Sequence, residues 1–270
     1  MWDWAKVKRI DIGSHYAMDT MIWKRIWGLG FALALCFVLS TCNDPNAWDC
    51  LKSAGEWRQE QRTIPSGVNA VHTTDGVNVR LIQSLAIDEY AVEGGANLLE
   101  KVKVSGIGPT LELRNENGCN LARATPDQLL VRLPMGQRKW RFFDLAGYGL
   151  LTNEDTLRGD TIRVNQYGAG KVDLKVKTNW MVLDLNGNGD FDLSGRTKYL
   201  QIFTALFNRF DATACAAETV YVYARGEHDI TVRADKMLYV SMEGTGDVNY
   251  VGNPELIVEQ KGGRGQVRPR

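Results

Sequence analysis

The stretch from position 184 to 195 has the residue types and spacing of a calcium loop. Oxygen-bearing side chains alternate along it, at Asp184, Asn186, Asn188, Asp190 and Asp192. Gly189 stands at the sixth position, where a calcium loop of the EF-hand type turns sharply, but position twelve, which should supply a bidentate glutamate, is Gly195. Asn and Gly are also typical of tight turns. We therefore expect turn chemistry here and no resident metal.

Cys42 could carry a covalent lipid. Lys24 and Arg25 precede an apolar run at positions 26–39, and Leu39-Ser40-Thr41 leads into the cysteine. A charged segment, a short apolar segment and small residues before a cleavage point are typical of an export signal. The run is shorter than the roughly 20 residues that span a bilayer. The segment resembles the bacterial lipobox, which implies a diacylated Cys42 as the first mature residue and a lipid anchor in the cell envelope, with the outer membrane as the expected location.

Four segments follow from this interpretation. Residues 1–20 form a polar extension ahead of the signal, and Met21 is an alternative start that would leave them untranslated. Residues 21–41 form the signal peptide, residues 42–63 a tether, and residues 64–268 a single domain.

Composition and motifs exclude several function classes. Lys plus Arg and Asp plus Glu both number 32, so no basic excess indicates a nucleic-acid partner. The chain contains no zinc-protease, nucleophile-elbow, phosphate-loop or dinucleotide motif, and we expect no cofactor and no catalytic residues. The most unusual surface candidate is the basic and aromatic run Arg138, Lys139, Trp140 and Arg141, which could bind anionic glycans or headgroups. The alternative is a strand whose aromatic residues cover one end of the domain.

An internal repeat positions most of these residues. Glycine-containing turns precede triplets with a polar residue between two neighbours that we place on the inward side, and successive triplets start 18 to 20 residues apart. The triplets are Val172-Asp173-Leu174, Phe191-Asp192-Leu193, Phe210-Asp211-Ala212, His228-Asp229-Ile230 and Val248-Asn249-Tyr250. Side chains alternate between the two faces of a strand. We therefore expect Asp173, Asp192, Asp211, Asp229 and Asn249 to form an outward ladder along one wall, which is a candidate binding face.

The period also predicts the fold. A propeller blade needs about 40 residues, whereas 19 or 20 suit one coil of a parallel β-solenoid with two or three short strands per coil. A second buried column is expected from Leu183, Ile202, Val220 and Val240. Short strands are expected from position 64 onward, with one helical turn at 96–101.

The chain resembles the head GIN domain, described as a putative auto-transporter adhesin domain. The similarity rests on the C-terminal run EGTGDVNYVGNPELIVEQKGGRGQV and on IPSGVNAVHTTDGVNVRLIQ, ANLLEKVKV, PTLELRNENG and LLVRLP, and it covers about residues 64–268. The resemblance implies a right-handed parallel β-helix on an exported or lipid-anchored bacterial protein. Asn208-Arg209 replaces the usual turn glycines, and Ala214–Glu218 is an insertion, so the third coil departs from the pattern.

These observations predict a non-catalytic, lipid-anchored protein of the cell envelope. Its expected partners are the membrane, through the N-terminal lipid, and a glycan or an envelope protein on its side wall. The alternative is a β-helix carbohydrate-active enzyme, a lyase or a hydrolase, although coils this short leave little room for the long loops that build such clefts. A structural spacer is a third interpretation.

Overall fold

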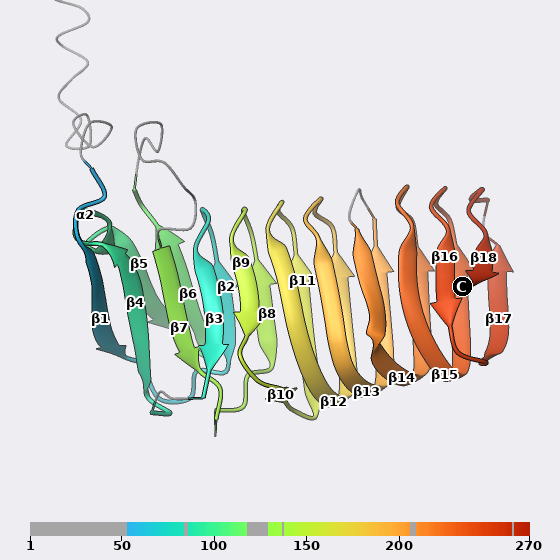
Figure 1. The fold of residues 1–270 in the computed structure, drawn as a ribbon, viewed down its shortest axis with the longest axis horizontal. Coiled ribbons are helices and arrows are strands. Elements are labelled where there is room, and N and C mark those ends of the chain that lie inside the picture. The colour runs from blue at the N-terminus through green and yellow to red at the C-terminus, as the bar shows by residue number, and fades with distance from the viewer. Residues whose placement is uncertain (1–52, 84–85, 118–128, 137, 206–208, 261) are drawn as a thin grey trace, which may run out of the picture. The chain divides into compact units, whose positions relative to one another are not determined.

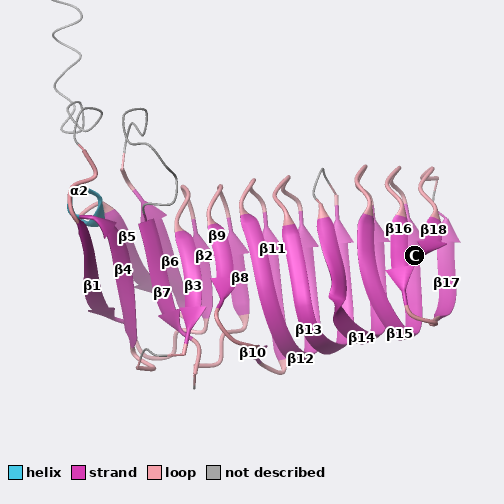
Figure 2. Cartoon of the chain, viewed as in Figure 1, coloured by secondary structure: helices cyan, strands magenta, loops and turns pink. Residues whose placement is uncertain are grey.

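The computed structural model describes residues 53–83, 86–117, 129–136, 138–205, 209–260 and 262–270. Its regular elements there are β-strands, apart from the four-residue helix α2 (Ala96–Leu99) (Figures 1 and 2). The strands lie side by side as successive coils of a β-solenoid (Figure 1). The predicted all-β fold is confirmed, and so is the helical turn. No helix in these ranges is long and apolar enough to cross a membrane.

Each central coil is one long strand that bends midway, rather than the two or three short strands that we expected. These strands are β12 (Lys171–Leu185), β13 (Phe191–Thr204), β14 (Phe210–Ala224) and β15 (Ile230–Met242). They pair in parallel, and each paired residue lies beside one 17 to 20 positions further along the chain. The repeat length predicted from the sequence is therefore the length of one coil.

The coils form two walls with the core between them. Wall 1 contains, in order, β1 (Trp57–Thr63), β4 (Glu89–Gly95), β7 (Leu129–Pro134), β3 (Asn78–Ile82), β9 (Leu150–Asn153), the first parts of β12 to β15, β16 (Val248–Val251) and β18 (Val267–Pro269). Wall 2 contains β5 (Val102–Ile107), β6 (Thr110–Asn115), β2 (Ala70–Thr73), β8 (Phe142–Leu145), β11 (Thr161–Gln166), the last parts of β12 to β15, and β17 (Glu255–Gln260). The two-residue β10 (Leu157–Arg158) pairs with the middle of β12.

The N-terminal coils do not stack in chain order. Strands β2 and β3 lie between β6–β7 and β8–β9, so the earliest coil is inserted between two later ones. Beyond them the pairing is antiparallel: β1 pairs with β4, β4 with β7, and β5 with β6. These strands close this end of the solenoid, where the stacking of coils stops. The tether predicted for residues 42–63 therefore extends too far, because Trp57–Thr63 pairs with β4 along its whole length.

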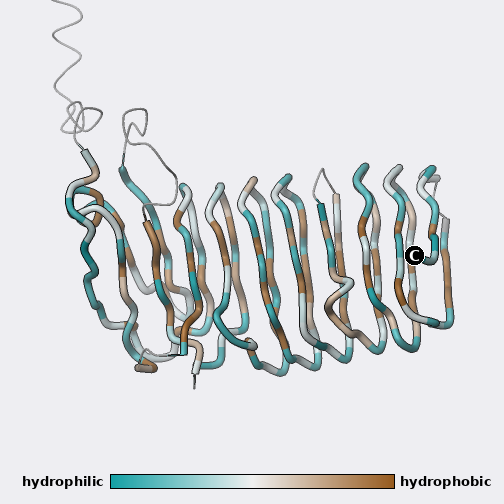
Figure 3. The backbone as a smooth tube through the Cα atoms, viewed as in Figure 1, coloured by the Kyte–Doolittle hydropathy of each residue, from teal (hydrophilic) through white to brown (hydrophobic). Residues whose placement is uncertain are grey.

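The core consists of inward columns that run from coil to coil. Apolar and polar residues alternate along the strands (Figure 3), and the inward residues of both walls pack into one cluster. One column is Val172, Phe191, Phe210, Ile230 and Val248, and another is Leu183, Ile202, Val222 and Val240. All of these side chains are almost fully buried. Our placement of Val220 in the second column was wrong, because the Ala214–Glu218 insertion shifts the pairing of β14 and puts Val220 beside Leu200.

The glycines of the turns are required by the close stacking of the coils. A Cβ on Gly187 would lie 2.0 Å from the carbonyl oxygen of Gly168, and a Cβ on Gly189 would lie 1.8 Å from that of Gly170. Gly168 stands in the same relation to Gly147 in the preceding coil. The Gly-x-Gly repeat therefore reflects a column of backbone contacts, including the early copy at 147–149.

Candidate functional site

The aspartate ladder on wall 1 is present over three coils. Asp173, Asp192 and Asp211 lie in register and point outward between buried neighbours. The column then continues through Thr231, in place of the expected Asp229, and through Asn249. Four of the five residues expected in the ladder thus share one outward column, while its role as a binding face stays a prediction.

Asp229 does not belong to the ladder, and His228 does not belong to the inward column. Both are exposed residues of the turn before β15, and Ile230 occupies the inward position beside Phe210. The error has a physical cause, since the insertion in β14 lengthens that coil to 20 residues. The Asp229 carboxylate accepts a hydrogen bond of 2.8 Å from the amide of Asp247 in the next coil.

Neighbouring groups compensate the charge of the ladder. Asp192 lies 3.0 Å from the guanidinium of Arg209 and 3.5 Å from the ammonium of Lys171. The hydrogen bond to Asp192 raises the pKa of Arg209. Burial alone would raise the pKa of Asp211, but hydrogen bonds from the amide and hydroxyl of Thr213, at 2.9 and 2.7 Å, outweigh it and lower the pKa. These partners within the protein favour a structural role for the ladder over a binding role.

The calcium-like residues do not converge on one point. Asp184 is on wall 2, where it lies 3.3 Å from Arg163 and accepts a hydrogen bond from Asn186. Asn188 is exposed in the turn, Asp190 pairs with Arg209 at 3.5 Å, and Asp192 is on wall 1. The described ranges contain no cluster of three or more His, Cys, Asp or Glu side chains able to hold a metal.

The basic and aromatic run at 138–141 is a surface feature only in part. Trp140 is 1% exposed, and its indole Nε1 donates to the carbonyl of Pro134 at 2.7 Å. Arg138 lies 5.6 Å from the centre of the Trp140 ring and donates to the carbonyls of Ile87 and Val68. Burial lowers the pKa of Arg138. Only Lys139 and Arg141 are exposed, so the run mainly secures the N-terminal coils.

The cysteine and histidine side chains that could react lie in different surroundings. Cys42 lies outside the described residues. Cys215 is fully buried, and burial raises the pKa of its thiol to about 12. His72 Nδ1 lies 2.8 Å from an Asp144 carboxylate oxygen on the neighbouring strand of wall 2. This pair connects two coils that are 72 residues apart in sequence.

The outer face of wall 2 carries an aromatic cluster that the sequence reasoning missed. We call it the aromatic face, and it consists of Trp180, Tyr199, Phe203, Tyr221, Tyr223 and Tyr239, at outward positions of β12 to β15. Trp180 stacks on Tyr199 with ring centres 4.4 Å apart, and Phe203 stacks on Tyr223 at 4.7 Å. The rings are part-exposed, and Phe203 is 36% exposed. The sequence feature that could have indicated this face is the alternation in Val220-Tyr-Val-Tyr, where the valines face inward and the tyrosines outward.

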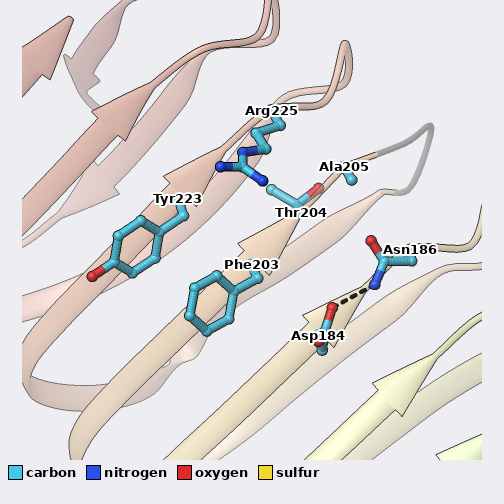
Figure 4. A pocket seen from close by; sticks show the side chains of 7 residues that line it. All are labelled: Asp184, Asn186, Phe203, Thr204, Ala205, Tyr223 and Arg225. Atoms are coloured by element: carbon cyan, nitrogen blue, oxygen red, sulfur yellow. Dashed lines mark hydrogen bonds between the residues drawn. The ribbon is translucent and has the colours of Figure 1, made fainter. Parts of the chain in front are cut away.

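A hollow of about 320 Å³ opens at the edge of the aromatic face, and we call it the edge hollow (Figure 4). Its lining residues come from three successive coils and are Asp184, Asn186, Phe203, Thr204, Ala205, Tyr223 and Arg225. The Phe203 and Tyr223 rings lie side by side with an interplanar angle of 10° (Figure 4). Asp184, Asn186 and Arg225 place polar groups around them. The hollow therefore combines flat apolar surfaces with hydrogen-bonding groups.

Three solved structures are similar to this chain in fold. A putative adhesin from Bacteroides fragilis has a TM-score of 0.72 at 18% identity, with 81% of this chain and 100% of that one covered. A putative lipid binding protein from Parabacteroides distasonis has a TM-score of 0.61 at 16% identity, with 81% and 100% covered. A putative adhesin from the same organism has a TM-score of 0.59 at 15% identity, with 81% and 99% covered. Identities this low establish the fold alone.

The comparison by sequence family is more specific. A search of the curated proteins finds no match. The family model described as "Putative auto-transporter adhesin, head GIN domain" matches residues 68–254, which is more than half of the chain and covers most of both walls. The chain therefore belongs to the head GIN domain family.

Proposed function

We propose that this protein is a non-catalytic, lipid-anchored component of the bacterial envelope that binds a partner on the side of its solenoid. The observation that carries the proposal is the regular stack of coils from β12 to β15, whose outward side chains form continuous faces on both walls. Solenoids commonly use such extended surfaces for binding. Membership of an adhesin-like family supports the same function.

Two features support attachment to the membrane through a lipid. The first is the run Leu39-Ser40-Thr41-Cys42 behind a charged and then apolar segment. The second is the position of the cysteine, since Cys42 precedes Trp57, where the first strand of the described residues begins, by only 15 positions. One acyl chain binds a membrane weakly, whereas several hold a protein firmly.

The test of anchoring uses the full chain in a Gram-negative host that processes lipoproteins. We expect the wild type in the membrane fraction, with an intact mass that shows cleavage before Cys42 and diacylation. The Cys42→Ser variant should lose the lipid mass. An unmodified wild-type chain that still begins at Met1 or Met21 would refute the lipid anchor.

The test of catalysis uses the detergent-solubilised full chain. Incubation with a panel of neutral and anionic polysaccharides should release neither new reducing ends nor unsaturated products. Sustained product release that scales with protein concentration would instead favour the carbohydrate lyase or hydrolase alternative.

A further inference from the structure

We infer that the aromatic face and the edge hollow form a binding site for a neutral polysaccharide chain. The inference deepens the proposed function, because it assigns a location and a ligand class to the binding role. It concerns wall 2, whereas the ladder expected from the sequence is on wall 1.

The aromatic residues hold outward positions on a rigid sheet. Tyr221 and Tyr239 lie directly beside each other on β14 and β15, and Phe203 lies beside Tyr223 on β13 and β14. The valines that flank Tyr221 are fully buried, so a flip of the strand would expose the core. The rings are thus held at the surface by the packing of their neighbours.

Part-exposed aromatic rings on a flat wall suit the apolar faces of sugar rings. The C–H groups of a pyranose face are weakly positive and meet the negative face of an aromatic ring. An aromatic cluster on the outside of a domain indicates a binding site more strongly than a single exposed apolar residue does. Stacking between coils accounts for the pairs themselves, but it does not require Phe203 to remain 36% exposed.

The polar groups around the hollow are suited to sugar hydroxyls. Asp184 and Asn186 come from one coil, and Arg225 comes from two coils further along, so they flank the rings of Phe203 and Tyr223 (Figure 4). Carboxylate and amide oxygens accept hydrogen bonds from hydroxyls, while amide and guanidinium groups donate them. Sites of this kind combine aromatic surface with a few placed polar groups.

The balance of charge favours an uncharged ligand. Asp184 pairs with Arg163 at 3.3 Å, and Arg225 pairs with Glu243 at 2.9 Å. Each charged group in the hollow therefore has an opposite partner close by, and no excess positive charge is left to attract an acidic polymer. Anionic glycans would require an unbalanced basic surface.

The size of the hollow fits a short stretch of chain. Its lining spans three coils, and neighbouring coils of a parallel sheet lie about 4.8 Å apart, so the span is roughly 10 Å. One coil spacing is close to the length of one sugar unit in an extended chain.

The experiment is affinity electrophoresis of the detergent-solubilised full chain through native gels containing xyloglucan, galactomannan or mixed-linkage β-glucan. A gel containing polygalacturonate tests binding to an anionic polysaccharide. The variants Phe203→Thr and Tyr223→Thr remove the rings but keep residues that favour strands. Tyr223→Phe keeps the ring, and Trp57→Ala removes an aromatic side chain that is 59% exposed on β1. Thermal unfolding confirms that each variant is folded at the temperature of the assay.

We expect at least one neutral polysaccharide to retard the wild type, with little change between about 0.05 and 0.5 M salt, since screening weakens only charge-driven binding. Phe203→Thr and Tyr223→Thr should each weaken binding at least tenfold, while Tyr223→Phe and Trp57→Ala should stay within about twofold of the wild type. The inference would be overturned if no neutral polysaccharide retards the wild type, or if only polygalacturonate does. It would also be overturned if the folded Phe203→Thr and Tyr223→Thr variants bind as well as the wild type. Lipidation at Cys42 would be unaffected by any of these results, so the proposed function can stand where the glycan site fails.

Discussion

The substitution Gly187→Ala tests the stacking of the coils directly. The new Cβ would lie 2.0 Å from the carbonyl oxygen of Gly168, and Cβ atoms essentially never approach other heavy atoms closer than 3.0 Å. The coils must therefore separate by about 1 Å at this turn, because the obstacle is backbone and cannot change rotamer. The adjacent hydrogen bond from the Asn186 amide to the Gln166 carbonyl, now 2.9 Å, would stretch beyond hydrogen-bonding range.

The expected cost combines these two effects. Overpacking contributes roughly 1–3 kcal/mol, and one lost backbone hydrogen bond contributes about 1 kcal/mol. A total of about 3 kcal/mol corresponds to a fall in Tm of roughly 6–12 °C for a domain of this size. Circular dichroism at the strand minimum during a thermal scan measures it.

Two control variants separate the clash from other effects of removing a glycine. Gly67 has a φ of +79° with nothing within 4 Å of an added Cβ, so Gly67→Ala adds only backbone strain of about 1–2 kcal/mol. Asn188→Ala changes the exposed residue next to Gly187 and should alter stability by less than about 0.5 kcal/mol. A Gly187→Ala protein that melts within 2 °C of the wild type, or no lower than Gly67→Ala, would refute the stacking argument.

Three further predictions follow from burial and charge. Leu183→Asp and Val240→Asp should each lower the free energy of unfolding by several kcal/mol, because a charge replaces a fully buried side chain; an unchanged Tm for both would show that the register is wrong. Asp211→Asn should destabilise the protein by about 1 kcal/mol at neutral pH, through the loss of charged hydrogen bonds to Thr213. The lowered pKa of Asp211 means that this difference is present above the ordinary carboxyl pKa and disappears as pH falls through the folded value, which urea titrations at several pH values can follow. Cys215, with its pKa raised to about 12, should react with iodoacetamide at pH 8 only after unfolding, and its alkylation in the native state would contradict the burial.

The alternation and the repeat period could be interpreted correctly because both are local. Val172-Asp173-Leu174 places its polar residue outward wherever the strand lies, since successive side chains point to opposite faces. The Gly-x-Gly turns recur for a similar reason, because identical coils bring identical backbone contacts. These features were sufficient to predict an all-β solenoid with coils of about 19 residues.

The register of the third coil, and of the coil that follows it, depended on tertiary structure. The Ala214–Glu218 insertion could be absorbed anywhere along the coil, and only the pairing of β14 with both neighbours placed it at the bend. Because Ile230 stacks beside Phe210, Asp229 lies in a turn. Spacing in the sequence alone had predicted that Asp229 belongs to the ladder. Likewise, nothing local indicated that β2 and β3 lie between two later coils, because that order is decided by pairings between distant strands.

In the candidate site, too, some features follow from the local sequence and others only from the tertiary structure. The sequence by itself determined that Tyr221 and Tyr223 alternate with buried valines, so both had to share one face of a strand. Only the stacking of three coils brought Phe203 beside Tyr223 and set Asp184 and Arg225 around them. The physical reason is that a solenoid face is built from residues about 19 positions apart, whose proximity depends on a register that every intervening turn and insertion can shift.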